Sequence, residues 1–204
     1  PDLRAERIPS EWELGMTGVM SGSRATLTFG GEAYRGDVRD MIVWAPDFRF
    51  VWSPRNVDVE RSGVEGRAEL RLPREGVHLS GSYSLARVTY GRSGARAGGT
   101  SGVQLAYRPR HSASLAAGWE GSQWRGELTG RYTGLRYPVP AAVNAMDPFW
   151  SFGASLVHSW SWPGWTMRTV VRADRLLDRR DSHIFGFPEP GRTFSVELRV
   201  ARAP

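Results

Sequence analysis

Alternation of apolar and polar residues with a period of two runs through most of this chain. It is clearest where Val64, Ala68 and Leu70 alternate with Glu69 and Arg71. This period is that of a β-strand, because successive side chains point to opposite faces of a sheet. The pattern recurs in the tail, residues 150–200, and in segments upstream, whereas no segment has a helical period. We expect an all-β, antiparallel protein of about nine strands.

The predicted strands are joined by connections of two lengths. Short turns are expected around Gly22, Glu75, Gly121 and Gly164, and long connections after Trp44, Tyr90, Tyr137 and Asp178. Such alternation is typical of an up-and-down outer-membrane β-barrel, which has short periplasmic turns and longer extracellular loops. Most predicted strands also reach the roughly 9–11 residues that a tilted membrane strand needs.

Composition restricts the function classes. No apolar run approaches the ~18–20 residues of a membrane-spanning helix, and a mean hydropathy of -0.40 argues against a helical membrane protein. Net charge is +6 and all 27 basic residues are arginine. These arginines are spread along the chain, unlike the basic patch of a nucleic-acid-binding protein, so no nucleic-acid partner is expected.

Five tryptophans lie beside predicted short turns: Trp119, Trp124, Trp160, Trp162 and Trp165. On a barrel these turns share one rim, where indoles form a membrane girdle with the ring in lipid and the N–H among headgroups. In a soluble sheet the same residues would pack in a core. Their position next to turns favours the girdle.

The opposite face of the predicted strands is polar or charged. We predict that it faces a barrel lumen through Glu65, Arg67, Glu69, Arg71, Arg125, Glu127, Arg131, Arg168 and Arg172. Opposite charges that pair across strands contribute roughly 0.2–1 kcal/mol each, and we interpret these residues as charge ladders rather than acid–base dyads. In a soluble β-sandwich the same face would be exposed to water.

No enzyme signature is present, so we expect no catalytic residue, cofactor or metal. The four histidines are scattered, and neither a nucleophile elbow nor a phosphate-binding glycine loop occurs. Ligand contacts are expected in the connection predicted for residues 45–54, from Phe48, Arg49, Phe50 and Trp52, because aromatic rings with an arginine suit a chelate or corrin surface. The alternative is that this loop packs on its neighbours.

Several short motifs occur in order along nearly the whole chain. They are Asp37–Ile42, Ser62–Glu65, Tyr107–His111, Leu176–Arg179 and Gly186–Phe194, the last containing Pro190-Gly191-Arg192. Together they resemble the C-terminal barrel portion of TonB-dependent outer-membrane receptors. Three features depart from that family. Arg175 stands where asparagine is usual, and no tyrosine follows Arg180. The chain also ends Val200-Ala201-Arg202-Ala203-Pro204 rather than in the aromatic residue that the barrel-assembly machinery recognises.

The resemblance implies a bacterial outer-membrane barrel of about 22 strands around an N-terminal plug. It implies uptake of a scarce nutrient, such as a metal chelate (siderophore) or cobalamin, with energy coupled through the TonB complex by way of the plug. Residues 1–204 would then be the C-terminal part of the barrel. The plug and N-terminal strands would lie outside this chain, because lipid does not tolerate unpaired strand edges. A passive porin or autotransporter-type barrel and a soluble carbohydrate-binding β-sandwich are the alternatives.

Overall fold

The computed structural model describes residues 3–46, 51–91, 101–139 and 143–202, and these residues form strands and connections without a helix. The strands are β1 (Arg7–Ser21), β2 (Thr26–Pro46), β3 (Trp52–Leu72), β4 (Val77–Tyr90), β5 (His111–Glu120), β6 (Trp124–Thr133), β7 (Phe149–Trp162), β8 (Trp165–Asp174) and β9 (Thr193–Arg202). Within the described residues, no helix has the length and apolar character of a membrane span.

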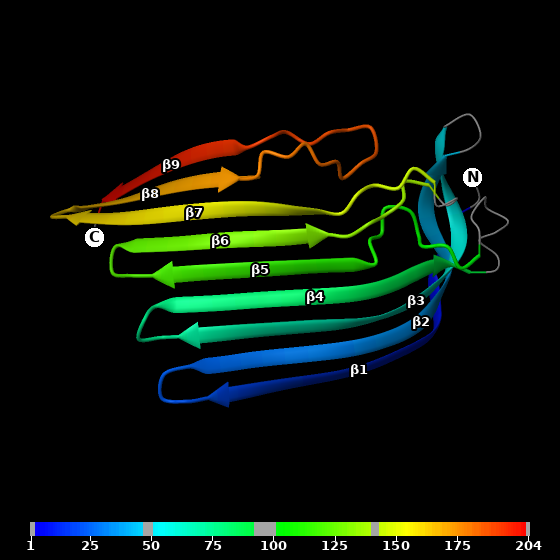
Figure 1. The fold of residues 1–204 in the computed structure, drawn as a ribbon, viewed down its shortest axis with the longest axis horizontal. Helices are drawn as coiled ribbons and strands as arrows, with labels where there is room; N and C mark the ends of the chain where they lie inside the picture. The colour runs from blue at the N-terminus through cyan, green and yellow to red at the C-terminus, as the bar shows by residue number, and fades with distance from the viewer. Residues whose placement is uncertain (1–2, 47–50, 92–100, 140–142, 203–204) are drawn as a thin grey trace.

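All nine strands belong to one antiparallel sheet in the order β1 to β9, so each strand pairs with its neighbours in sequence. Figure 1 shows the short turns at one end of the sheet and the longer connections at the other. The predicted all-β, antiparallel arrangement is confirmed. A β-sandwich needs a second sheet packed on the first, and the described residues form one sheet only.

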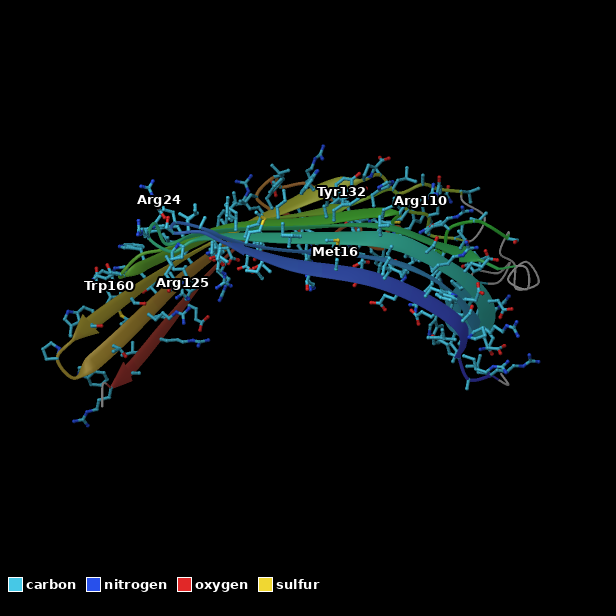
Figure 2. All side chains as sticks on the ribbon, turned by 90° about the horizontal axis from the view of Figure 1, so that it is seen from below. Met16, Arg24, Arg110, Arg125, Tyr132 and Trp160 are labelled. Carbon is cyan, nitrogen blue, oxygen red and sulfur yellow. The ribbon has the colours of Figure 1, made fainter. Side chains whose placement is uncertain are left out.

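Strand register gives the sheet one apolar and one polar face, because directly opposite residues in adjacent strands share a face. One row runs Leu27, Leu70, Leu79 and Ala117 across β2 to β5. A row on the other face runs Thr26, Arg71, His78 and Gly118 across the same strands. The sheet is bent into an arch, with Tyr132 of the apolar face on its convex side (Figure 2).

The prediction that residues 45–54 form a connection is wrong in its bounds. β2 continues to Pro46 and β3 begins at Trp52, and these two residues are paired. Prolines at 46 and 54 suggest a loop in the sequence because proline cannot donate to a strand ladder, yet Pro54 pairs with Trp44. The motif Ser62–Glu65 lies in the middle of β3.

A β-bulge at Asp40 allows the long β2–β3 hairpin to bend. The register shifts between Val38 and Met41, and Asp40 has a φ of 57°. Its backbone N–H donates to Asp58 Oδ1 at 3.0 Å, and its carbonyl accepts from Asn56 Nδ2 at 2.6 Å. The Arg7 guanidinium pairs with its carboxylate at 2.9 Å. These contacts satisfy the groups that the bulge removes from the ladder.

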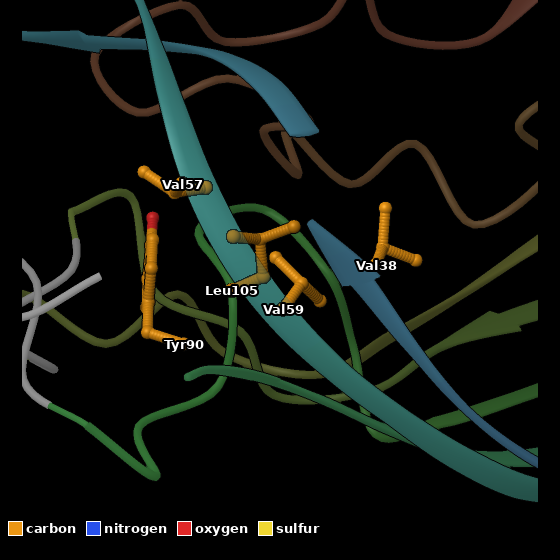
Figure 3. Packing of buried hydrophobic residues seen from close by; sticks show 5 residues of the cluster. All are labelled: Val38, Val57, Val59, Tyr90 and Leu105. Carbon is orange, nitrogen blue, oxygen red and sulfur yellow. The ribbon is translucent and has the colours of Figure 1, made fainter. Parts of the chain in front are cut away.

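The buried apolar core is small and lies at the end of the sheet with the long connections. Its main cluster consists of Val38, Val57, Val59, Tyr90 and Leu105 (Figure 3), and Met146, Phe149 and Val170 are buried outside this cluster. Leu105 reaches it because residues 102–105 pair with the end of β4, with Leu105 N–H donating to the Val88 carbonyl at 2.7 Å. Over the rest of the sheet the large apolar side chains of the convex face are exposed or half-buried, with Leu79, Leu128 and Leu156 among the exposed ones.

Candidate functional site on the concave face

The polar face forms a hollow of about 700 Å³ across β1 to β6. Small residues keep it open, since serines 82, 84, 112 and 114 and Gly30 line it together with longer charged side chains. The Ser82 and Ser114 hydroxyls are hydrogen-bonded at 2.7 Å. The result is a shallow polar wall with room for a ligand or another protein segment beside it.

Charges in the hollow are unevenly compensated. Glu32 lies directly opposite Glu65, and Glu65 accepts a hydrogen bond from the Ser84 hydroxyl at 3.0 Å. Arg67 and Arg131 also line the hollow and have no carboxylate partner among the described residues. Like charges placed directly opposite are destabilising, so this wall is suited to contact a surface that supplies countercharge.

The residues of the predicted charge ladders all lie in β3, β6 or β8, with their alternation as expected. Pairing across strands is seen for Arg125 with Glu120 and for Arg172 with Glu197, the latter at 3.4 Å. Arg71 instead pairs with Glu69 in its own strand. Glu127 lies 4.0 Å from His78 Nε2. Arg168, opposite Ser159 and Arg199, has no carboxylate partner in the described part of the chain.

A second hollow of about 480 Å³ adjoins the first where β5 to β8 meet the connection 175–192. Arg131 and Thr133 line both hollows. Asp174, Arg175 and His183 line the second hollow and not the first, and none of them was predicted as a site residue. His183 is isolated in the sequence, so nothing there indicated its position beside β7.

The motif from Leu176 to Arg192 closes the β8–β9 connection at its base. Asp178 has a φ of 54°, and its Oδ1 accepts a hydrogen bond from the Arg192 backbone N–H at 2.8 Å. Arg175 donates to the Pro190 carbonyl at 2.7 Å and pairs with the Glu189 carboxylate. A side chain at Gly191 would meet Asp178 Oδ1 at 2.6 Å, which explains the glycine in Pro-Gly-Arg.

The five predicted girdle tryptophans lie together at the end of the sheet with the short turns. Each is between 41% and 52% exposed, and Figure 2 shows Trp160 at this end of the sheet. Trp124 and Trp160 cover His158, with ring centroids 4.0 and 3.9 Å away. Trp160 stacks on Trp162 at 5.8 Å. These rings form an aromatic layer on the convex face.

Of the four predicted ligand-contact residues, Phe48, Arg49 and Phe50 lie outside the described residues. Trp52 is the first residue of β3, so its assignment to a loop is wrong; the residue is 46% exposed. Among the described residues, no group of three or more histidine, aspartate or glutamate side chains is placed to hold a metal ion. The concave wall offers hydroxyl, carboxylate and guanidinium groups, which are hydrogen-bonding and charged groups suited to a polar molecule.

Comparison with known proteins identifies the family. Residues 1–173 match the family model described as TonB dependent receptor-like, beta-barrel. The chain belongs to this family. Its members are bacterial outer-membrane transporters and not enzymes. The predicted family and the predicted location are therefore confirmed. A search of curated proteins gave no match.

Solved structures of receptor barrels have the same fold. Copper transporter OprC is 19% identical with a TM-score of 0.69, over 97% of this chain and 31% of that one. The ferric-catecholate import receptor Fiu from E. coli K12 is 18% identical with a TM-score of 0.67, over 99% and 28%. The FrpB iron transporter from Neisseria meningitidis is 13% identical with a TM-score of 0.65, over 99% and 32%. The chain thus spans about a third of the length of these proteins.

Proposed function

We propose that this chain forms part of the barrel wall of a TonB-dependent receptor that takes up a scarce nutrient across the outer membrane. The match to the receptor family over residues 1–173 is the observation that carries the proposal. The similar solved structures include a copper transporter, a ferric-catecholate receptor and an iron transporter. The substrates named for these proteins favour a metal ion or a metal chelate such as a siderophore over cobalamin.

In this proposal the convex face meets lipid and the concave face lines the lumen. The girdle tryptophans then lie at the periplasmic interface, and the long connections lie outside the cell. The hollow of about 700 Å³ falls within the ~300–1,000 Å³ of small-molecule sites. Its uncompensated carboxylates and arginines are suited to contact a plug domain and a passing ligand.

We further propose that residues 1–204 act together with additional strands and a plug. β1 and β9 are the two edges of the described sheet, and an unpaired edge leaves backbone groups without partners that lipid cannot replace. Pairing of both edges by the remaining barrel strands removes this cost. The proposed partners are thus the plug, TonB acting through it, the barrel-assembly machinery, outer-membrane lipid and the nutrient.

The test is uptake of radioactive iron, supplied as ferric citrate or as a ferric catecholate, by cells that produce the complete protein. Uptake is expected to require the protein and to stop when tonB is deleted. Uptake that persists without TonB would contradict the receptor proposal and favour a passive porin. The variant Leu156→Arg, which places a cation on the convex face, serves as the unassembled control.

A further inference from the structure

Arg136 is a buried cation in the connection between β6 and β7. Its side chain is 2% exposed, although it lies only three residues beyond the end of β6. Arginine is rarely buried to this extent unless its guanidinium is paired or hydrogen-bonded. Burial lowers the pKa of the Arg136 guanidinium, while the nearby Asp181 carboxylate opposes that shift. Such a group requires specific partners.

The partners of Arg136 come from two different connections. One guanidinium nitrogen donates to the carbonyl of Ser182, 46 residues away in the β8–β9 connection. The other donates to the Gly134 carbonyl at 3.5 Å. The guanidinium also lies over the Phe149 ring, 5.2 Å from its centroid. Cation–π contacts of this kind strengthen when the cation is shielded from water.

The backbone at Arg136 is anchored by hydrogen bonds of its own, independently of the side-chain contacts. Its N–H and carbonyl exchange hydrogen bonds with Met146, at 3.4 and 2.8 Å, so these two residues are paired within the β6–β7 connection. The next residue, Tyr137, accepts a hydrogen bond from the Tyr107 N–H at 2.7 Å. The guanidinium therefore extends from an anchored backbone.

Ser182 is followed by His183, which packs edge-on against the same Phe149 ring at 5.1 Å. Arg136 and His183 thus share one aromatic ring, and His183 lines the hollow of about 480 Å³. Removing the guanidinium would leave the Ser182 carbonyl without its donor and would expose one face of Phe149. The β8–β9 connection would then lose its attachment to the β6–β7 connection at this point.

We propose that Arg136 is a positioning residue that clamps Ser182 of the β8–β9 connection onto residues 134–137 of the β6–β7 connection and so holds His183 at the smaller hollow. Ser182 and His183 then keep their place relative to Arg136 when a ligand approaches the concave face. This clamp does not depend on which molecule is transported, so its test stands apart from the uptake experiment.

The chain contains no cysteine, so a single spin label can report on the clamped connection. The label is attached to Ile184→Cys, next to His183 at a position that is 56% exposed. Spectra are recorded on the complete protein, purified from the outer membrane in detergent. We expect a restricted spectrum with Arg136, a several-fold larger mobile fraction with Arg136→Met, and partial restoration with Arg136→Lys. Arg180→Met, an exposed arginine of the same connection, is the matched control.

A label that is equally restricted with Arg136→Met would overturn the clamp, as would an equal gain in mobility with Arg180→Met. If Arg136→Met fails to assemble, the variant Phe149→Leu, which removes the shared ring, is measured with the same spin label. Retained restriction in Phe149→Leu would likewise count against the proposal. Heat-modifiable migration on gels shows which variants have assembled.

Discussion

At the level of single residues, the polar contacts explain parts of the sequence that composition cannot. Asp178, Gly191 and Arg192 form one arrangement, in which the carboxylate accepts the Arg192 N–H and the glycine leaves room for it. The motif was recognisable in the sequence, but its geometry was not, because residues 179–190 separate its two halves. Spacing along the chain does not show which residue a side chain will hydrogen-bond across a loop.

Replacing Asp178 by alanine removes the acceptor for the Arg192 N–H. Hydrogen bonds to charged groups contribute about 1.5–3 kcal/mol, and Asp178 is exposed, so a loss of about 1 kcal/mol in the free energy of unfolding is expected. Urea titration of the protein in lipid vesicles measures it. Asp178→Asn keeps an acceptor oxygen and is expected to lose less; equal losses in the two variants would contradict the assigned contact.

Gly76 requires glycine for two reasons. Its φ is +65°, and an added Cβ would lie 2.1 Å from the Glu120 carbonyl of the neighbouring turn. Strain at such a backbone position is about 1–3 kcal/mol, and the overlap adds to it. Gly76→Ala is therefore expected to destabilise the protein by more than about 2 kcal/mol in the same titration. Gly66→Ala, with open space around it, is the control and should change little.

At the level of strands, period-two alternation located all nine elements but misplaced several ends. The large error was at the β2–β3 hairpin, where Pro46 ends β2 and Pro54 lies within β3, and both residues are paired. Proline usually indicates the end of a strand because it lacks an N–H to donate to the ladder. The sequence does not show whether the ladder needs a donor at that position. Residues 47–50, between the two strands, lie outside the described residues, so the proposed contacts of Phe48, Arg49 and Phe50 remain predictions.

The two faces of β7 give a matched pair of substitutions. Leu156 lies opposite Gly126 and Val171 on the convex face, while Ser155 lies opposite Glu127 and Arg172 on the concave face. Arginine at a mid-membrane lipid-facing position costs about 2–4 kcal/mol. Leu156→Arg is therefore expected to block assembly, measured as loss of heat-modifiable protein in outer membranes. Ser155→Arg is expected to assemble. The reverse result would show that the concave face, and not the convex face, meets lipid.

At the level of the whole molecule, sequence reasoning reached the fold class, the family and the two faces of the sheet. It did not reach the hollows or the Arg136 contacts. Alternation is a local property, so it reports which side chains share a face of one strand. A hollow depends on which rows of serine, glycine and arginine become neighbours across five or six strands. The Arg136–Ser182 contact joins residues 46 positions apart, and no local pattern marks either one.

The orientation of the whole sheet in the membrane can be tested through its tryptophans. Trp160, Trp162 and Trp165 surround one short turn on the convex side. If this end lies at an interface, phospholipids brominated near the headgroup should quench their fluorescence, because bromine quenches an indole only on close contact. The variant with phenylalanine at all three positions is expected to lose a large part of this quenching. Trp44 lies at the other end of the sheet, near the end of β2. Replacing it by phenylalanine is expected to leave most of the quenching unchanged. Equal quenching in the parent and the triple variant would show that these rings do not lie in lipid, and the girdle interpretation would then be wrong.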